Sequence, residues 1–114
     1  MLDSGPDISL RDLRSIYALH QSIDTNIAHL EIQGRKYYIK ERELHILDTY
    51  DTLYIFDLTE SLTDQIEKLS VYFTERGIDT SKEMTYIDMR VPRGIFQCSR
   101  ENENRCRRNL INLY

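Results

Sequence analysis

The segment Met84–Cys98, with the sequence MTYIDMRVPRGIFQC, contains two short apolar runs on either side of a turn signal. The first run, Met84–Met89, is rich in residues that suit a pleated strand. The second run, Gly94–Cys98, is a shorter strand candidate. Pro92 has no N–H to donate and Gly94 tolerates a positive φ, so the residues between the runs favour a turn or a bulged corner. We therefore predict two strands joined by a short connection.

The chain before this segment starts with a helix pattern and then changes to strand patterns. Apolar residues at three- and four-residue steps predict a helix over residues 10–22, for which Ser9 is the expected N-cap. Apolar and polar residues alternate over residues 27–33, which predicts a half-buried strand. Gly34 and Arg35 then predict the tight turn of a hairpin.

Three further strands are expected before the second helix. The apolar runs that predict them cover residues 37–39, 44–47 and 53–56. The last of these runs is apolar without interruption, which is typical of a strand buried on both faces. We therefore expect residues 53–56 to lie near the centre of the sheet and the earlier strands to lie nearer its edge.

The second helix has the clearest pattern in the chain. Its core-facing residues follow steps of four and three: Leu62, Ile66, Leu69 and Phe73. Its predicted solvent-facing residues are Glu60, Asp64, Glu67, Lys68 and Glu75. Thr59 or Ser61 can cap the start of the helix, and Gly77 is the expected left-handed stop.

Together these elements predict an α+β fold, with a mostly antiparallel sheet of five to six strands and two helices packed on one of its faces. Residues 1–8 are expected to be a flexible lead-in, residues 9–98 a single domain, and residues 99–114 a basic polar tail. A chain of 114 residues with 40% hydrophobic and 30% charged residues suits one small globular domain.

Charge is divided unevenly along the chain. Residues 1–89 carry a formal charge of −8 and residues 90–114 carry +4, within a net charge of −4. No apolar run reaches the roughly 20 residues that a membrane-spanning helix needs. The first residues also have no pattern of a secretory signal, so we expect the chain alone to be soluble, with no export signal.

No residue constellation predicts catalysis or a cofactor. Cys98 and Cys106 are too far apart for a zinc knuckle and have no histidine near them in sequence, so a disulfide and two free thiols both remain open. Asp48 and Asp51 are the best candidates for a metal-dependent nuclease, but no Glu-x-Lys pair accompanies them. We therefore predict no catalytic residue, no metal site and no cofactor, and hence a protein that is not an enzyme.

The element Tyr86-Ile87-Asp88-Met89-Arg90 resembles a motif of the FtsQ/DivIB family of bacterial cell-division proteins. The family typically has I/V-D-L/M-R at this place, and Arg93-Gly94-Ile95-Phe96 is similar to the strand that follows it. The order of elements from about Ile27 onward is also similar, so the resemblance covers about two thirds of the chain. It is to the C-terminal β domain of the family, whose transmembrane helix and POTRA domain have no counterpart in this sequence.

This resemblance implies a divisome scaffold that binds the coiled-coil division proteins FtsB and FtsL at the septum. A partner would add a strand to the last strand of the β domain, on the extracytoplasmic side of the bacterial inner membrane if the chain belongs to a longer bitopic parent. Unpaired N–H and C=O groups on a terminal strand provide a template for such addition. The residues implied as partner-binding are Tyr86, Arg90, Arg93, Gly94, Ile95, Phe96, Gln97 and Cys98.

The alternative function is nucleic-acid binding by the basic tail. Four arginines of the tail would make the contacts: Arg100, Arg105, Arg107 and Arg108. Such binding would weaken steeply with added salt, because it rests on phosphate neutralisation.

Overall fold

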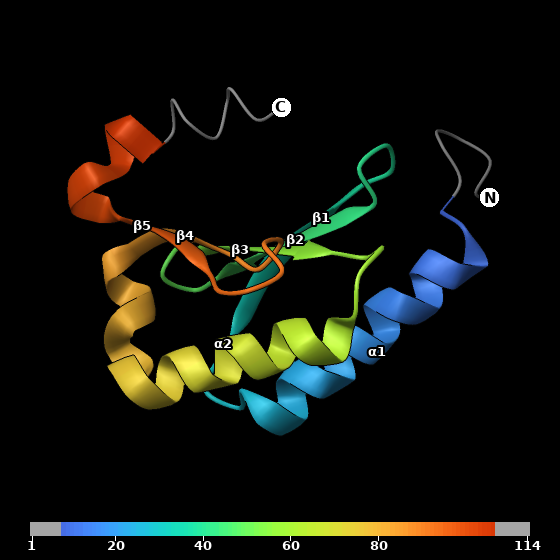
Figure 1. Ribbon diagram of the computed structural model, residues 1–114, viewed down its shortest axis with the longest axis horizontal. Coiled ribbons are helices and arrows are strands. Elements are labelled where there is room, and N and C mark those ends of the chain that lie inside the picture. Colours follow the sequence, from blue (N-terminus) through green and yellow to red (C-terminus); the bar gives the residue numbers. More distant parts are fainter. Residues whose placement is uncertain (1–7, 107–114) are drawn as a thin grey trace.

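The computed structural model describes residues 8–106 and has an α+β fold, in which two helices cover one face of a five-stranded sheet (Figure 1). In chain order its elements are α1 (Leu10–Asn26), β1 (Ile32–Tyr38), β2 (Glu43–Asp48), β3 (Leu53–Asp57), α2 (Leu62–Arg76), the 3-10 helix η1 (Ile78–Glu83), β4 (Met84–Asp88), β5 (Phe96–Ser99) and the 3-10 helix η2 (Arg100–Asn102). The predicted fold class is confirmed.

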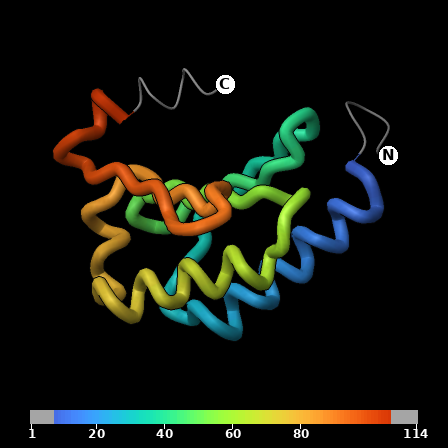
Figure 2. The backbone as a smooth tube through the Cα atoms, viewed as in Figure 1, coloured from blue at the N-terminus to red at the C-terminus, as the bar shows by residue number. Residues whose placement is uncertain are grey.

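The strands lie side by side in the order β1-β2-β3-β4-β5. Three of the four pairs are antiparallel, and β3 pairs with β4 in parallel. The connection between these two parallel strands contains α2, and Figure 2 shows the backbone leaving the sheet for this helix and returning at β4. Parallel neighbours need such a crossover, because a tight turn cannot join them.

Strand β3 occupies the central place that the sequence predicted. Tyr54, Ile55 and Phe56 in its middle are fully buried, although their side chains alternate between the two faces of the sheet. On the helix-covered face Tyr54 and Phe56 join a core built from α1, β2, α2 and β4, whose members include Leu19, Ile23, Leu44, Ile46, Leu69, Phe73 and Ile87.

Helix α2 begins after Ser61, one of its two predicted caps, and ends at the predicted Gly77, although the ψ of +151° there is not that of the expected left-handed helical conformation. The Ser61 hydroxyl accepts a hydrogen bond from the Asp64 N–H at 3.2 Å, which satisfies one of the free donors of the first turn. Gly77 ends the helix with φ +95°, a conformation that L side chains avoid. Its core-facing residues Ile66, Leu69 and Phe73 are buried, so the sequence pattern fixes which face of α2 meets the sheet.

The prediction for the first hairpin is wrong in its register. Helix α1 continues to Asn26, and the apolar residues Ile27 and Leu30, which resemble alternating strand positions, are instead buried in the turn after this helix. Gly34 and Arg35 lie inside β1, paired with β2 next to an irregularity in the register, rather than in a turn. The chain reverses between Tyr38 and Glu43, where Arg42 has φ +53°.

The N-terminal half of α1 is attached to this hairpin by one buried carboxylate. Asp12 is 1% exposed and accepts a hydrogen bond from the Tyr37 hydroxyl at 2.5 Å and from Arg42 Nη2 at 2.6 Å. The hydrogen bond from Arg42 holds the pKa of Asp12 below its ordinary value, although burial opposes this shift. The hydrogen bonds from Tyr37 and Arg42 to Asp12 therefore hold α1 against the hairpin of β1 and β2, at the edge of the sheet opposite β5.

The first part of the predicted basic tail packs onto the domain. Cys98 and Cys106 form a disulfide, and Arg100 donates to the Lys82 carbonyl at 2.9 Å and to the Tyr50 carbonyl. Residues 1–7 of the predicted lead-in and residues 107–114 lie outside the described residues. Within residues 8–106, no helix has the length and apolar character needed to cross a membrane.

Candidate partner-binding edge and groove

Strand β5 is the last strand of the sheet. It pairs with β4, and the part of the chain that the structure describes places no strand on its other side. The side chains of β5 alternate between the two faces of the sheet. Phe96, which pairs with Asp88, and Cys98, which pairs with Tyr86, share one face, and Gln97 between them lies on the other. An edge of this kind offers backbone N–H and C=O groups to a further strand.

The two faces of β5 have different surroundings. Phe96 is 59% exposed on the face away from the helices, while Cys98 on that face is buried and bonded to Cys106. On the helix side, Ile95 packs against the core and Gln97 accepts a hydrogen bond from the Tyr72 hydroxyl of α2. Burial raises the pKa of Tyr72, so its hydroxyl stays protonated and able to donate at neutral pH.

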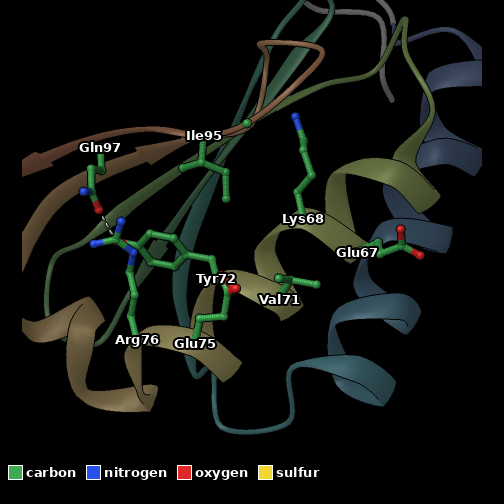
Figure 3. Close-up of a pocket in the computed structure, with 9 residues that line it drawn as sticks. Glu67, Lys68, Val71, Tyr72, Glu75, Arg76, Ile95 and Gln97 are labelled. Atoms are coloured by element: carbon green, nitrogen blue, oxygen red, sulfur yellow. Dashed lines mark hydrogen bonds between the residues drawn. The ribbon is translucent and has the colours of Figure 1, made fainter.

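A groove of about 360 Å³ runs between β5 and α2 (Figure 3). It is lined by Glu67, Lys68, Val71, Tyr72, Glu75 and Arg76 from α2, and by Gly94, Ile95 and Gln97 from the other side. Val71, Ile95 and the Tyr72 ring form the apolar part of its walls. The Arg76 guanidinium lies over the Tyr72 ring, 5.1 Å from the ring centre. The groove therefore lies between α2 and the start of the edge strand β5.

Lys68 connects α2 to the loop before β5, although the sequence pattern placed it on the solvent face. Its ammonium group donates to the Met89 carbonyl at 2.9 Å and to the Val91 carbonyl. Burial lowers the pKa of Lys68, while the charge of Asp88 opposes that shift. A long side chain that spans from a helix to loop carbonyls leaves no mark in the hydrophobic periodicity, so the sequence could not show this role.

We predict that Lys68→Met will loosen the loop from Met89 to Ile95 without unfolding the domain. Two carbonyls lose a charged donor, and hydrogen bonds to charged groups contribute about 1.5–3 kcal/mol each. Amide hydrogen exchange, measured by mass spectrometry, should therefore speed up in residues 89–97 and stay unchanged in α1. Lys82→Met, at a more exposed lysine on η1, is the control, and equal acceleration in both variants would contradict a specific role for Lys68.

Arg90, predicted to flank the binding edge, belongs to a buried ionic cluster on the helix-free face. Its Nη2 contacts Asp88 Oδ2 at 2.6 Å and its Nη1 contacts Glu43 Oε2 at 2.9 Å. Glu43 also contacts His45 Nε2 at 3.0 Å, and burial lowers the pKa of His45 while this contact opposes the shift. The hydrogen bond with Asp88 raises the pKa of Arg90, so the cluster keeps its cation.

The other predicted partner-binding residues surround the edge at different depths. Tyr86 is half-buried on β4, opposite Cys98. Arg93 and Gly94 are exposed in the loop, and Gly94 has φ +125°, which only glycine adopts readily. The structure thus places Ile95, Phe96 and Gln97 at the free edge and Tyr86 on the neighbouring strand, whereas the guanidinium of Arg90 is directed into the cluster.

The candidate nuclease residue Asp48 has a structural role. It is 1% exposed and accepts hydrogen bonds from the N–H groups of Tyr50 and Thr52, at 2.8 and 2.9 Å, and from the Tyr54 hydroxyl at 2.9 Å. These donors hold the turn between β2 and β3. Among residues 8–106 the structure contains no group of three or more His, Cys, Asp or Glu side chains arranged to hold a metal ion.

The residues of the nucleic-acid alternative are divided. Arg100 is directed at carbonyls of the domain and at Thr52 Oγ1, 3.1 Å away, whereas Arg105 is exposed. Arg107 and Arg108 lie outside the described residues.

Comparison with known proteins does not test the resemblance. A scan against protein-family models finds no match, and no curated protein matches the chain at a significant level. The suspected relation to the FtsQ/DivIB family therefore rests on the sequence motif and on the order of elements, and it stays a prediction.

Proposed function

We propose that this chain is a non-enzymatic interaction domain that binds an extended segment of a partner protein by strand addition at β5. The observation that carries the proposal is the coincidence of a free strand edge with an apolar groove beside it. Backbone hydrogen bonds would supply affinity, and the groove would supply selectivity for the partner's side chains. The resemblance to FtsQ/DivIB makes FtsB- and FtsL-type coiled-coil division proteins the expected partners.

The side chains of an added strand would alternate between two environments. One set would face the groove beside Ile95 and Val71, and the other would face the exposed ring of Phe96. Buried aromatic anchors contribute strongly to interfaces, so Phe96 is the expected main contact on the helix-free side. Tyr86 and Gln97 complete the contact region, and Arg90 supports it indirectly through its cluster.

The Met89 N–H bonds to the Ile55 carbonyl of β3, so the backbone groups of Asp88 face β5 and those of its partner Phe96 face β4. The next residue, Gln97, therefore offers its N–H at the free edge. The test is a calorimetric titration with the soluble parts of FtsB- and FtsL-type partners, using wild-type protein and two variants at Gln97. Gln97→Pro removes the outward N–H, and we expect binding to fall by at least about tenfold. Gln97→Ala loses the same side chain but keeps the N–H, so it should bind within a few-fold of wild type. Circular dichroism and thermal unfolding establish that both variants are folded.

Two outcomes would overturn the proposal. A folded Gln97→Pro variant that binds the partners as well as wild type does would show that β5 is not the edge used. Capture of nucleic acid alone, with a steep loss of affinity as salt rises, would transfer the function to the arginines of the tail.

A further inference from the structure

The outer wall of the groove is formed by a regular row of three residues on α2. Glu67, Val71 and Glu75 follow one another at four-residue steps and therefore share one face of the helix. All three are exposed, and Val71 is 49% exposed. Figure 3 shows Val71 between the two carboxylates along the helix. The row thus has an apolar centre with a negative charge at each end.

An added strand would meet this row rather than the row next to it. Lys68, Tyr72 and Arg76 form the inner row, and Tyr72 is hydrogen-bonded to Gln97 on the existing edge strand. A further strand would lie about 4.8 Å beyond β5. The outer row lines the same groove as Ile95 and Gln97, and its three side chains are left exposed by the existing edge strand. Figure 3 places Ile95 nearer to Lys68 and Gln97 nearer to Arg76, so the strand and the helix run along the groove together.

The spacings of the helix and the strand agree. Residues four apart on a helix are separated by about 6 Å along its axis, and alternate residues of a strand by about 6.6–6.8 Å. Three consecutive side chains on one face of an added strand therefore fall opposite Glu67, Val71 and Glu75. Because the row is symmetric about Val71, this match holds for either direction of the added strand.

The charges of the groove favour a basic partner. The inner cations are engaged: Lys68 donates to loop carbonyls and Arg76 lies over the Tyr72 ring. The structure gives neither Glu67 nor Glu75 an ion pair or side-chain hydrogen bond with another described residue. Their carboxylates stay available to cations that approach from the partner side, and they repel acidic segments.

We infer that the segment bound at β5 carries the pattern basic–x–aliphatic–x–basic on the face that it turns toward α2. The aliphatic side chain contacts Val71 and Ile95, and the two Lys or Arg side chains reach Glu67 and Glu75. This inference rests on the proposed strand addition and specifies its partner. The groove would select among extended segments by their charge and by their register, because a shift of one residue moves all three side chains to the other face of the added strand.

The test uses two synthetic nine-residue peptides with the central sequences KTVTK and ETVTE, titrated into isotope-labelled protein and followed by NMR. We expect the KTVTK peptide to shift the amide signals of residues 95–99 and of Val71, and to bind about tenfold more tightly than the ETVTE peptide. The double variant Glu67→Lys/Glu75→Lys should reverse this preference. The matched control Glu41→Lys/Glu101→Lys changes the net charge equally at two exposed residues outside the groove, and it should keep the wild-type preference.

The outcomes separate this inference from the proposed function. Equal binding of both peptides at β5, or an unchanged preference in the Glu67→Lys/Glu75→Lys variant, overturns the charge pattern while strand addition stands. Absence of shifts at residues 95–99 with the KTVTK peptide also overturns the pattern, and the Gln97→Pro titration then decides separately whether β5 binds a partner. Equal loss of preference in the two double variants would assign the effect to net charge and would likewise overturn it.

Discussion

Replacing Arg90 with alanine is expected to lower the free energy of unfolding by about 3–5 kcal/mol, the usual cost of removing one partner from a buried ionic cluster. The Arg90 side chain is 17% exposed, and the carboxylates that it contacts on Asp88 and Glu43 are 4% and 9% exposed. Without the guanidinium, both carboxylates lose a charged donor in a place that water reaches poorly. Their burial then destabilises the two negative charges, because fewer hydrogen bonds compensate for the lost contact with water.

Urea unfolding followed by circular dichroism measures this effect. Arg93→Ala is the matched control, because Arg93 is exposed in the same loop and surface substitutions usually change stability by less than about 0.5 kcal/mol. Arg90→Lys should recover only part of the loss, since an ammonium group cannot make the paired contacts of a guanidinium. If Arg90→Ala and Arg93→Ala destabilised the domain equally, the cluster would have no special part in holding β4.

Replacing Asp48 with alanine should cost about 3 kcal/mol of unfolding free energy. The change leaves the Thr52 N–H and the Tyr54 hydroxyl without their acceptor, and each buried donor left unsatisfied costs about 1–3 kcal/mol. Asp48→Asn keeps one carbonyl oxygen in place and should lose less. The same urea experiment gives the values.

Asp51 provides the control for this prediction. It lies in the same turn, is exposed, and has φ +64°, a conformation that asparagine tolerates. Asp51→Asn should therefore leave stability nearly unchanged. A protein in which Asp48→Ala was as stable as wild type, but lost a magnesium-dependent cleavage activity, would favour the nuclease alternative over the structural role.

The parts of the fold that were predictable from the sequence are those set by hydrophobic periodicity. The apolar row of α2, its stop at Gly77 and the uninterrupted run of β3 all depend on which side chains must leave water, and that information is local. In these cases local pattern and tertiary packing favour the same structure.

The features that the sequence missed depend on contacts between distant residues. Gly34 and Arg35 resemble a turn, but pairing with β2 places them within a strand, because tertiary pairing outweighs local turn preference. Lys68 and Arg90 have ordinary solvent-facing patterns, but the Met89 carbonyl that Lys68 binds lies 21 residues away in the chain, and the Glu43 carboxylate that Arg90 binds lies 47 residues away. The disulfide between Cys98 and Cys106 stayed open for a different reason, since the spacing of two cysteines alone does not decide whether they pair.

The β4–β5 hairpin, which carries the proposed binding edge, pairs with the rest of the sheet through the short parallel ladder between β3 and β4. Among the described residues, the ladder between β3 and β4 consists of three register pairs, Leu53 with Tyr86, Tyr54 with Ile87 and Ile55 with Asp88. Local opening of this ladder would release both strands as one unit. A partner that binds β5 alone therefore stabilises β4 as well, by mass action. Slower amide hydrogen exchange in β4 would then show that the neighbouring strand β5 is occupied.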